Sequence, residues 1–197
     1  MTARAYAKAI GLALLLAVLI RGVGLEAFKI PSASMLPTLQ LGDYVLINKL
    51  RYGVRIPGLD RWLVRYAGPQ PGDVIVFANA RDTSADYVKR VVAVAGEVVE
   101  IRNKQVLVNG VPREVPSAYF AQRAHVQSTG PRDNSGPVRV PPGQVFVLGD
   151  NRDQSIDSRY WGFVDVSDVE GKALLVYWSV DSDDGSVRWE RTGKLVR

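Results

Sequence analysis

The sequence predicts a mainly β protein, in which one antiparallel-sheet domain with a small inserted β excursion follows a single N-terminal transmembrane helix. The only apolar segment of helical length lies near the N-terminus, and no helical hydrophobic periodicity of any length follows it. The later apolar residues form short runs rich in β-branched and aromatic residues, separated by turns that contain Gly, Pro, Asn or Asp. At 197 residues, the chain is long enough for one ordinary domain plus an appendage.

The composition excludes several kinds of site. Because the chain has no cysteine, it has no disulfide framework, thiolate zinc site or cysteine nucleophile. Its single histidine, His125, lies in a polar stretch typical of a solvated loop, which disfavours a Ser-His-Asp triad. The net charge of +5 comes from scattered basic residues, which favours a membrane surface over nucleic acid as a partner. No cofactor is expected.

The N-terminal segment is expected to anchor the chain in a membrane. Residues 9–20 are continuously apolar but cover only about 18 Å as a helix. Extension to Phe28 gives about 20 residues, which is close to the thickness of the hydrocarbon core. A cleaved signal peptide is the alternative, with Arg4 and Lys8 as its positive region, but no small-x-small cleavage site follows.

The strands of the β domain are predicted from its apolar runs. After a turn at Leu41–Asp43, strands are expected at residues 44–49, 74–77, 86–94, 98–102, 105–108, 145–148 and 173–178, with a further candidate at 186–190. Asn109 and Gly110 predict a two-residue hairpin turn.

Two stretches rich in Gly and Pro are predicted to lie outside the main sheet. Residues 51–72 contain seven of these residues and predict a loop or an irregular hairpin. Its one apolar cluster, residues 61–64, is expected to pack back on the core rather than touch lipid. Residues 102–143 are predicted to form a small excursion from the main sheet.

A short run between two prolines, residues 30–39, is the first candidate for chemistry. The prolines disfavour a helix, so the segment between them is expected to be extended, with Ser32 and Ser34 on the same side. An ordinary proline-bounded loop with two hydrogen-bonding serines is one interpretation. The other is a serine nucleophile, which needs a base to take its proton.

Lys89 is the candidate base. Strand alternation over residues 86–94 puts Lys89 and Arg90 on opposite faces, so one of them enters an apolar surface. Burial disfavours the ammonium form and lowers the pKa of a lysine, as a general base at neutral pH requires. A lysine on a solvated strand surface is the alternative.

The polar run at residues 149–159 follows a predicted buried strand. Its density of Gly, Asp, Asn, Arg and Ser suits an ordinary turn or a metal loop, but EF-hand spacing fails and no metal site is expected. Asp157 and Arg159 are spaced for a local ion pair. A hydroxyl such as that of Ser155 can orient a lysine amine.

Four segments together resemble the bacterial type I signal peptidases, membrane-bound Ser/Lys endopeptidases that remove signal peptides from exported preproteins. In the order of that family they are residues 28–39, 72–77, 86–92 and 149–162. Each is moderately specific, and the four together are very specific. Residues 51–71 and 102–143 fall where the family varies.

The resemblance implies a role for each group at the site. Ser34 is the expected nucleophile, and Lys89 is the expected general base. Ser32 and the Ser34 backbone N–H are the expected oxyanion donors, and Ser155 is expected to orient Lys89. The residues expected to support the site are Gly149, Asp150, Asp157 and Arg159.

The resemblance also implies shallow substrate pockets for small residues at the first and third positions before the cut. The expected lining residues are Phe28, Ile30, Pro31, Met35, Leu39, Tyr87 and Val88. The sequence departs from the family pattern at Ala33, Ala93, Ala95 and Gln154. None of these departures removes a reacting group.

These inferences give an expected organisation and location. Residues 1–8 are expected in the cytoplasm, residues 9–28 in the bacterial inner membrane, and residues 29–197 outside as the catalytic β domain. The expected partners are preprotein signal peptides, membrane lipid and the export translocon, without nucleic acid. A membrane-anchored binding or scaffolding β domain is the main alternative. A self-cleaving Ser/Lys repressor is another, but the chain offers no DNA-binding helical domain.

Overall fold

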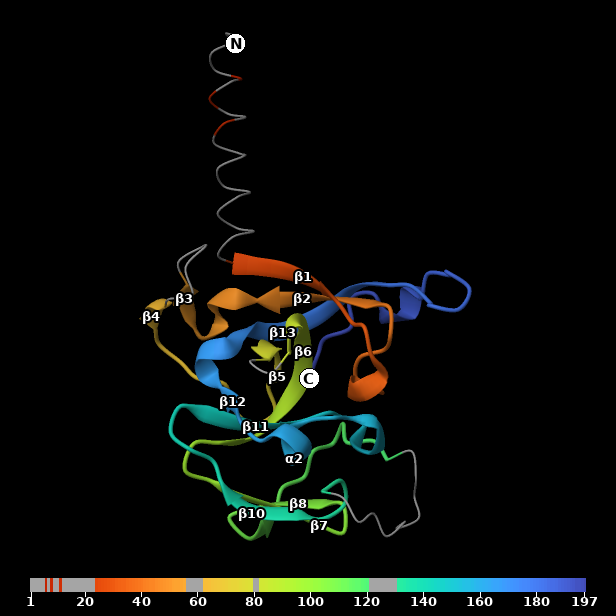
Figure 1. The fold of residues 1–197 in the computed structure, drawn as a ribbon. Helices are drawn as coiled ribbons and strands as arrows, with labels where there is room; N and C mark the ends of the chain where they lie inside the picture. The colour runs from red at the N-terminus through yellow and green to blue at the C-terminus, as the bar shows by residue number, and fades with distance from the viewer. Residues whose placement is uncertain are drawn as a thin grey trace.

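The protein is built mainly from antiparallel β-sheet, which confirms the mainly β part of the predicted fold class (Figure 1). The computed structural model describes residues 24–55, 62–79, 82–120 and 131–197, together with Tyr6, Lys8 and Gly11. These residues form a seven-stranded, a four-stranded and a two-stranded sheet. The four-stranded sheet lies at the far end of the molecule from β1 (Figure 1).

The seven-stranded sheet has the order β1-β2-β13-β5-β6-β11-β12. Its strands are β1 (Leu25–Lys29), β2 (Asp43–Asn48), β5 (Val74–Asn79), β6 (Asp82–Val94), β11 (Gln144–Leu148), β12 (Val164–Asp165) and β13 (Val169–Ser179). The four-stranded sheet contains β7 (Val98–Arg102), β8 (Gln105–Val108), β9 (Val111–Pro112) and β10 (Ser135–Arg139). The two-stranded sheet is the hairpin of β3 (Gly53–Arg55) and β4 (Trp62–Arg65).

Short helical turns connect these strands. The described α-helix is α2 (Ser158–Trp161), and the 3-10 turns are η2 (Ala33–Met35), η3 (Lys49–Arg51), η4 (Arg152–Gln154), η5 (Val166–Asp168) and η6 (Trp189–Arg191). Gly42 has φ +86°, a conformation that glycine adopts without strain, and it completes the predicted turn before β2.

The core lies on both faces of β5, as its continuous apolar run predicts. Val74 and Val76 pack in one cluster with residues of β2 and β13, whereas Ile75 and Phe77 pack in a second cluster with residues of β11. A third cluster, which includes Phe146, joins β11 to the four-stranded sheet. This packing holds the central strands in place, among them β6, which carries the candidate base Lys89.

The predicted membrane anchor ends earlier than Phe28. Residues 25–28 belong to β1, which pairs with β2 from Leu25↔Asn48 to Lys29↔Tyr44, so another strand satisfies their backbone groups. Apart from Gly11, residues 9–23 of the anchor lie outside the described residues, as does His125. The anchor therefore stays a prediction. Within the described part of the chain, no helix is both long enough and apolar enough to cross a membrane.

Three further boundaries differ from the predictions. The inserted sheet begins at Val98 rather than residue 102, and it contains β10, which the sequence hides because Gly136 and Pro137 weaken the strand pattern. Residues 186–190 form one bridge, between Val180 and Val187, and then enter η6 rather than a strand. The stretch at 51–72 contains the β3–β4 hairpin, with Leu63 and Val64 exposed rather than packed on the core.

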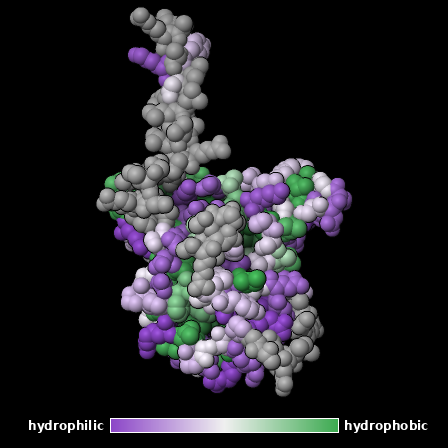
Figure 2. Space-filling model, in the orientation of Figure 1, coloured by the Kyte–Doolittle hydropathy of each residue, from purple (hydrophilic) through white to green (hydrophobic). Residues whose placement is uncertain are grey.

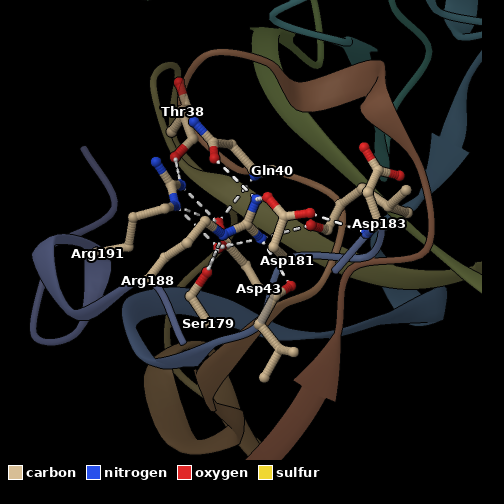
Figure 3. A network of polar contacts seen from close by, with 10 residues as sticks. Thr38, Gln40, Asp43, Ser179, Asp181, Asp183, Arg188 and Arg191 are labelled. Carbon is tan, nitrogen blue, oxygen red and sulfur yellow. Dashed lines mark hydrogen bonds and ion pairs between the residues drawn. The ribbon is translucent and has the colours of Figure 1, made fainter. Parts of the chain in front are cut away.

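A buried charge network fixes the loop that follows η2 (Figure 3). Asp43 is fully buried and accepts hydrogen bonds from the Arg191 guanidinium at 2.5 and 2.9 Å and from Ser179 Oγ at 2.7 Å. Burial alone would raise the pKa of Asp43. Hydrogen bonds from Arg191, the Gln40 backbone and Ser179 nevertheless hold the pKa of Asp43 below its usual value. Arg191 also donates to the carbonyl of Thr38 at 3.1 Å, so the network reaches the segment beside η2.

We predict that Asp43→Asn lowers the free energy of unfolding by about 3 kcal/mol, because it leaves the Arg191 charge buried without its partner. Urea denaturation at pH 7 measures the loss. The loss should shrink as the pH falls below about 4, because the carboxyl of the unfolded wild-type chain takes up a proton there while the folded one, with its lowered pKa, is still charged. Glu100→Gln is the control, since its pair with Arg102 is exposed and should cost less than about 1 kcal/mol. Equal losses in the two variants would contradict the prediction.

Candidate active site

The two candidate reacting groups, Ser34 and Lys89, meet in a buried site. Lys89 Nζ lies 2.7 Å from Ser34 Oγ, although the residues are 55 positions apart in the chain. Only 8% of Ser34 and 4% of Lys89 is exposed. Their approach depends on η2 packing against β6, the strand that carries Lys89. A buried amine in contact with a hydroxyl can take its proton.

The turn that carries Ser34 is less extended than the sequence predicts. Ser32 has extended backbone angles, but Ala33–Met35 forms the 3-10 turn η2. The two serines nevertheless lie on the same side, as predicted, because Ser32 Oγ is 3.1 Å from Ser34 Oγ. A second hydroxyl therefore lies beside the candidate nucleophile.

Burial shifts Lys89 toward its neutral form. Loss of water lowers the pKa of Lys89 from 10.5 to about 8. The Asp157 and Asp150 carboxylates oppose this shift, whereas the positive charge of Arg159 adds to it. The sequence predicts that one of Lys89 and Arg90 enters the interior. In the structure, both side chains are buried.

Each of the two nearby carboxylates is bound by an arginine. Asp150 accepts from Arg90 Nε and Nη2, both at 2.7 Å. Asp157 accepts from Arg159 Nε and Nη2, both at 2.8 Å, as the sequence spacing predicts. All four side chains are buried, so these pairs balance negative charge next to Lys89 without solvent.

The polar loop at residues 149–159 holds the Ser34 backbone directly. Asn151 N donates to the Ser34 carbonyl at 3.0 Å, and Asn151 Nδ2 donates to the Ala33 carbonyl at 3.1 Å. Gly149 permits this approach, since a Cβ there would lie 2.5 Å from the Ser34 carbonyl oxygen and 2.3 Å from Ser155 Oγ. The loop therefore fixes the position of Ser34, the candidate nucleophile, by hydrogen bonds to the main-chain carbonyls of η2.

One polar contact ties this loop to the segment after η2, and another joins the two ends of the loop to each other. The Thr38 hydroxyl donates to Asp150 Oδ2 at 2.5 Å, while Asp157 Oδ2 accepts from Gly149 N at 3.0 Å. The predicted supporting residues Gly149, Asp150, Asp157 and Arg159 all take part in the polar contacts of this loop, and their support of the dyad stays a prediction. The predictions gave no role to Thr38, Arg90 or Asn151, although all three lie inside the recognised motifs.

Ser155 lies beside the dyad but is not bonded to it. Its side chain is buried, and within the described ranges its Oγ has no hydrogen-bond partner, Lys89 included. Its predicted role in orienting Lys89 therefore stays a prediction. Arg152 is also buried, and burial lowers its pKa to about 10; it donates through Nε to the Gly149 carbonyl at 3.1 Å.

Most of the predicted pocket residues form one apolar cluster next to Ser34. Ile30, Met35, Leu39 and Val88 are buried together, with Phe28 packed against them. Pro31 is exposed, and Tyr87 belongs to the second core cluster, where its ring stacks on Phe77. Met35 and Leu39 lie at 1% and 0% exposure, so they lie beneath the surface instead of lining it.

One well-formed cleft in the described part of the chain lies away from the two candidate reacting groups. It has a volume of about 530 Å³ and is lined by residues that include Pro71, Arg90, Val115 and Arg197, but neither Ser34 nor Lys89. No group of three or more His, Asp or Glu side chains suited to a metal ion occurs in the part of the chain that the structure describes.

Known proteins resemble this chain over most of its length. The family model described as "Signal peptidase, peptidase S26" matches residues 3–178. The signal peptidase I of Pseudomonas fluorescens is 35% identical over 204 residues, which cover 88% of this chain and 72% of that protein. The signal peptidase I of Leptolyngbya laminosa is 35% identical over 181 residues, which cover 88% and 79%. A crystal structure of a signal peptidase I from Enterococcus faecalis V583 is 32% identical and covers 53% of this chain and 95% of that one, with a TM-score of 0.43.

We predict that Lys89→Met stabilises the protein at pH 7 by about 2 kcal/mol. The shift of the Lys89 pKa from 10.5 to about 8 costs about 3 kcal/mol, and loss of the bond to Ser34 returns about 1 kcal/mol of that. The cost is fully present below pH 8, where both states are protonated, and it vanishes as the pH rises through 10.5. Urea denaturation at pH 7 and pH 9.5 should therefore show a gain that shrinks with pH.

The matched control is Lys194→Met, because Lys194 is exposed. Its free energy of unfolding should differ little from that of the wild type at either pH. A Lys89→Met protein that is less stable than the wild type at pH 7 would contradict the conclusion that burial of the Lys89 charge destabilises the fold.

Proposed function

This chain belongs to the signal peptidase family, peptidase S26, and on that premise we propose that it cleaves N-terminal signal peptides from exported preproteins through a Ser34 acyl-enzyme with Lys89 as general base. Membership of this family makes it a serine endopeptidase. The observation that supports the Ser/Lys mechanism is the 2.7 Å contact between Ser34 Oγ and Lys89 Nζ, both of which belong to buried residues.

The first half of the reaction acylates Ser34. Neutral Lys89 takes the hydroxyl proton as Ser34 Oγ attacks the carbonyl carbon of the scissile bond. The resulting oxyanion accepts hydrogen bonds from the Ser34 backbone N–H and from the Ser32 hydroxyl, each worth about 3 kcal/mol in the transition state. The Lys89 ammonium then gives its proton to the leaving amine, and the mature protein departs.

The second half releases the signal peptide. Neutral Lys89 takes a proton from a water molecule, which attacks the acyl carbonyl. The tetrahedral intermediate collapses, and the proton returns to Ser34 Oγ. One lysine therefore serves both steps, which requires a pKa near the working pH.

The substrate is proposed to bind as an added strand along β6. β5 pairs with one edge of β6 from Asp82 to Arg90, but β11 pairs with the other edge only from Arg90 to Val94. Among the described strands, none pairs with that second edge between Asp82 and Lys89. An extended peptide there can hydrogen-bond to the free edge and pass Ser34.

The preference for small residues before the cut follows from the cluster beneath this edge. Alternate side chains of an extended peptide point into the same surface. The fully buried floor of Met35 and Leu39 leaves little depth there. Small residues at the first and third positions before the cut therefore fit best.

The membrane arrangement is part of the proposal. The apolar run at residues 9–20 stands just before β1, and Arg4 and Lys8 favour a cytoplasmic N-terminus. The β domain would then lie on the outer side of the bacterial inner membrane, where translocated preproteins arrive beside the translocon. Between residue 24 and Ser34 the chain spans at most about 35 Å, which keeps the nucleophile near the bilayer.

We predict that Ser34→Ala and Lys89→Ala each lower kcat for a labelled preprotein by roughly 10⁴-fold or more, because they remove the nucleophile or its base. The assay uses the full chain in detergent, and sequencing of the new N-terminus identifies the cut. Lys194→Ala is the control, since that lysine is exposed. Substantial turnover by a folded Lys89→Ala protein would exclude the dyad.

We also predict that kcat falls about tenfold per pH unit on the acid side of the Lys89 pKa, because only the neutral amine accepts the proton. With that pKa lowered to about 8 in the free enzyme, the acid limb should begin at or below pH 8. A bound signal peptide adds burial and moves the limb to lower pH. Single-turnover rates measured from pH 5 to 9 provide the test, and a flat profile would contradict the proposal.

A further inference from the structure

A second cleft lies where the four-stranded sheet meets the polar loop at residues 149–159. It has a volume of about 340 Å³, and its lining includes Val106 of β8, Pro112 of β9 and Arg152 of η4. We call it the Arg152 cleft. Hydrophilic and hydrophobic residues are interspersed over the coloured part of the face in Figure 2, as is ordinary for a protein surface, so a concave space is the better guide to a ligand site.

Arg152 lines this cleft with a hydrogen-bond donor that the protein does not use. The residue is 4% exposed, and its Nε donates to the Gly149 carbonyl at 3.1 Å. In the part of the chain that the structure describes, its Nη2 atom is buried and has no hydrogen-bond partner. Buried polar groups are normally hydrogen-bonded, and a ligand oxygen would satisfy this one.

The charge of Arg152 also favours an anion. The nearby Asp150 and Asp157 carboxylates are each bound by another arginine. Burial lowers the pKa of Arg152 to about 10, and the positive charge of Arg159 adds to this shift. A negative charge brought next to Arg152 would therefore be stabilised in a site that holds excess positive charge.

The other basic residues of the cleft already have acidic partners. Lys104 Nζ lies 2.9 Å from Asp153 Oδ1, and Arg113 Nη2 lies 2.8 Å from Glu97 Oε1. Among the described residues that line the cleft, Arg152 therefore supplies the positive charge that is still available to a ligand. One positive charge suits a carboxylate, which carries one negative charge, better than a phosphate, which carries nearly two. The planar guanidinium also matches the geometry of a carboxylate.

The rest of the cleft suits an apolar body. Val106 and Phe120 line it, and its volume lies at the lower end of the range for small-molecule sites. Backbone hydrogen bonds hold its walls, because Arg113 N donates to the Val106 carbonyl at 2.9 Å and Tyr119 N donates to the Asp150 carbonyl at 2.7 Å. A small ligand with an aromatic or aliphatic group beside its carboxylate therefore fits a preformed space.

We propose that the Arg152 cleft binds a small organic carboxylate, whose oxygens accept hydrogen bonds from the Arg152 guanidinium and whose apolar body packs on Val106 and Phe120. The proposal does not rest on the cleavage of preproteins. It places the ligand next to the residues that hold the nucleophile, because the backbone N–H of the adjacent Asn151 donates to the Ser34 carbonyl at 3.0 Å.

The test titrates phenylacetate into the full ¹⁵N-labelled chain in detergent and follows the backbone amide signals by NMR. 2-Phenylethanol is the matched neutral probe, since it has the same ring without the charge. Inorganic phosphate is an anion without an apolar body. We expect phenylacetate to bind with a Kd of about 1 mM and to cause its largest shifts at residues 104–106 and 113–118. The other two probes should bind at least about tenfold more weakly.

Four variants test the role of the lining residues. Arg152→Gln should weaken phenylacetate binding by about tenfold or more, because it removes the charge and shortens the donor. Glu114→Gln, at an exposed acidic residue of the cleft, should tighten binding about two- to fivefold. Ala118→Leu adds bulk to the lining without a change of charge and should weaken binding several-fold. Lys194→Gln, at an exposed lysine outside the lining, should have no effect.

Several results would overturn the inference. They are the lack of a saturable shift with phenylacetate, equal binding of 2-phenylethanol, and tighter binding of phosphate. Unchanged affinity in a folded Arg152→Gln protein would do the same. If urea denaturation shows that this variant does not fold, Glu114→Gln and Ala118→Leu decide, and unchanged affinity in both would exclude the site. None of these results bears on signal peptide cleavage, which is measured separately.

Discussion

The burial of Lys89 against Ser34 is the constraint on which the rest of the site depends. A lysine that acts as a base must lose its proton near neutral pH, and here burial does most to lower the pKa of Lys89. The same burial strengthens every nearby charge. Asp150 and Asp157 both favour the ammonium form of Lys89, so they are tolerable only because Arg90 and Arg159 bind them in bidentate geometry. The two ion pairs therefore help to keep the proton affinity of Lys89 low.

The position of Ser34 depends on segments from the whole β domain. Asn151 holds the main chain of η2, and Asp150 holds Thr38 three residues beyond it. Arg191, near the last strand, binds the Thr38 carbonyl and Asp43 (Figure 3). The turn η2 contains only three residues, which are too few to fix the side-chain rotamer of Ser34 without tertiary contacts. The fold therefore supplies by tertiary contacts the rigidity that local structure lacks.

The sequence predicted the features that local patterns encode. The apolar runs predicted most strands, and the spacing of Asp157 and Arg159 predicted their ion pair. The resemblance supplied Ser34 and Lys89, which the structure brings together. The pairing of Asp150 with Arg90 joins residues 60 positions apart, so no local pattern reveals it. β10 and the exposed face of β4 were missed for a related reason, because tertiary packing decides whether a Gly-Pro segment pairs or an apolar cluster is covered.

Buried polar atoms without a hydrogen-bond partner lower the stability of this protein. Within the described ranges, the buried side-chain atoms without a hydrogen-bond partner are Asn151 Oδ1, Arg152 Nη2, Ser155 Oγ and Trp161 Nε1, all between residues 151 and 161. Each such group costs about 1–3 kcal/mol, and burial of the Lys89 ammonium adds a cost of similar size at neutral pH. The large core on both faces of β5 offsets these costs. Selection for stability alone would remove such atoms, so their concentration between residues 151 and 161, in the segment that binds the Ser34 main chain, indicates a loop shaped by positioning rather than by packing.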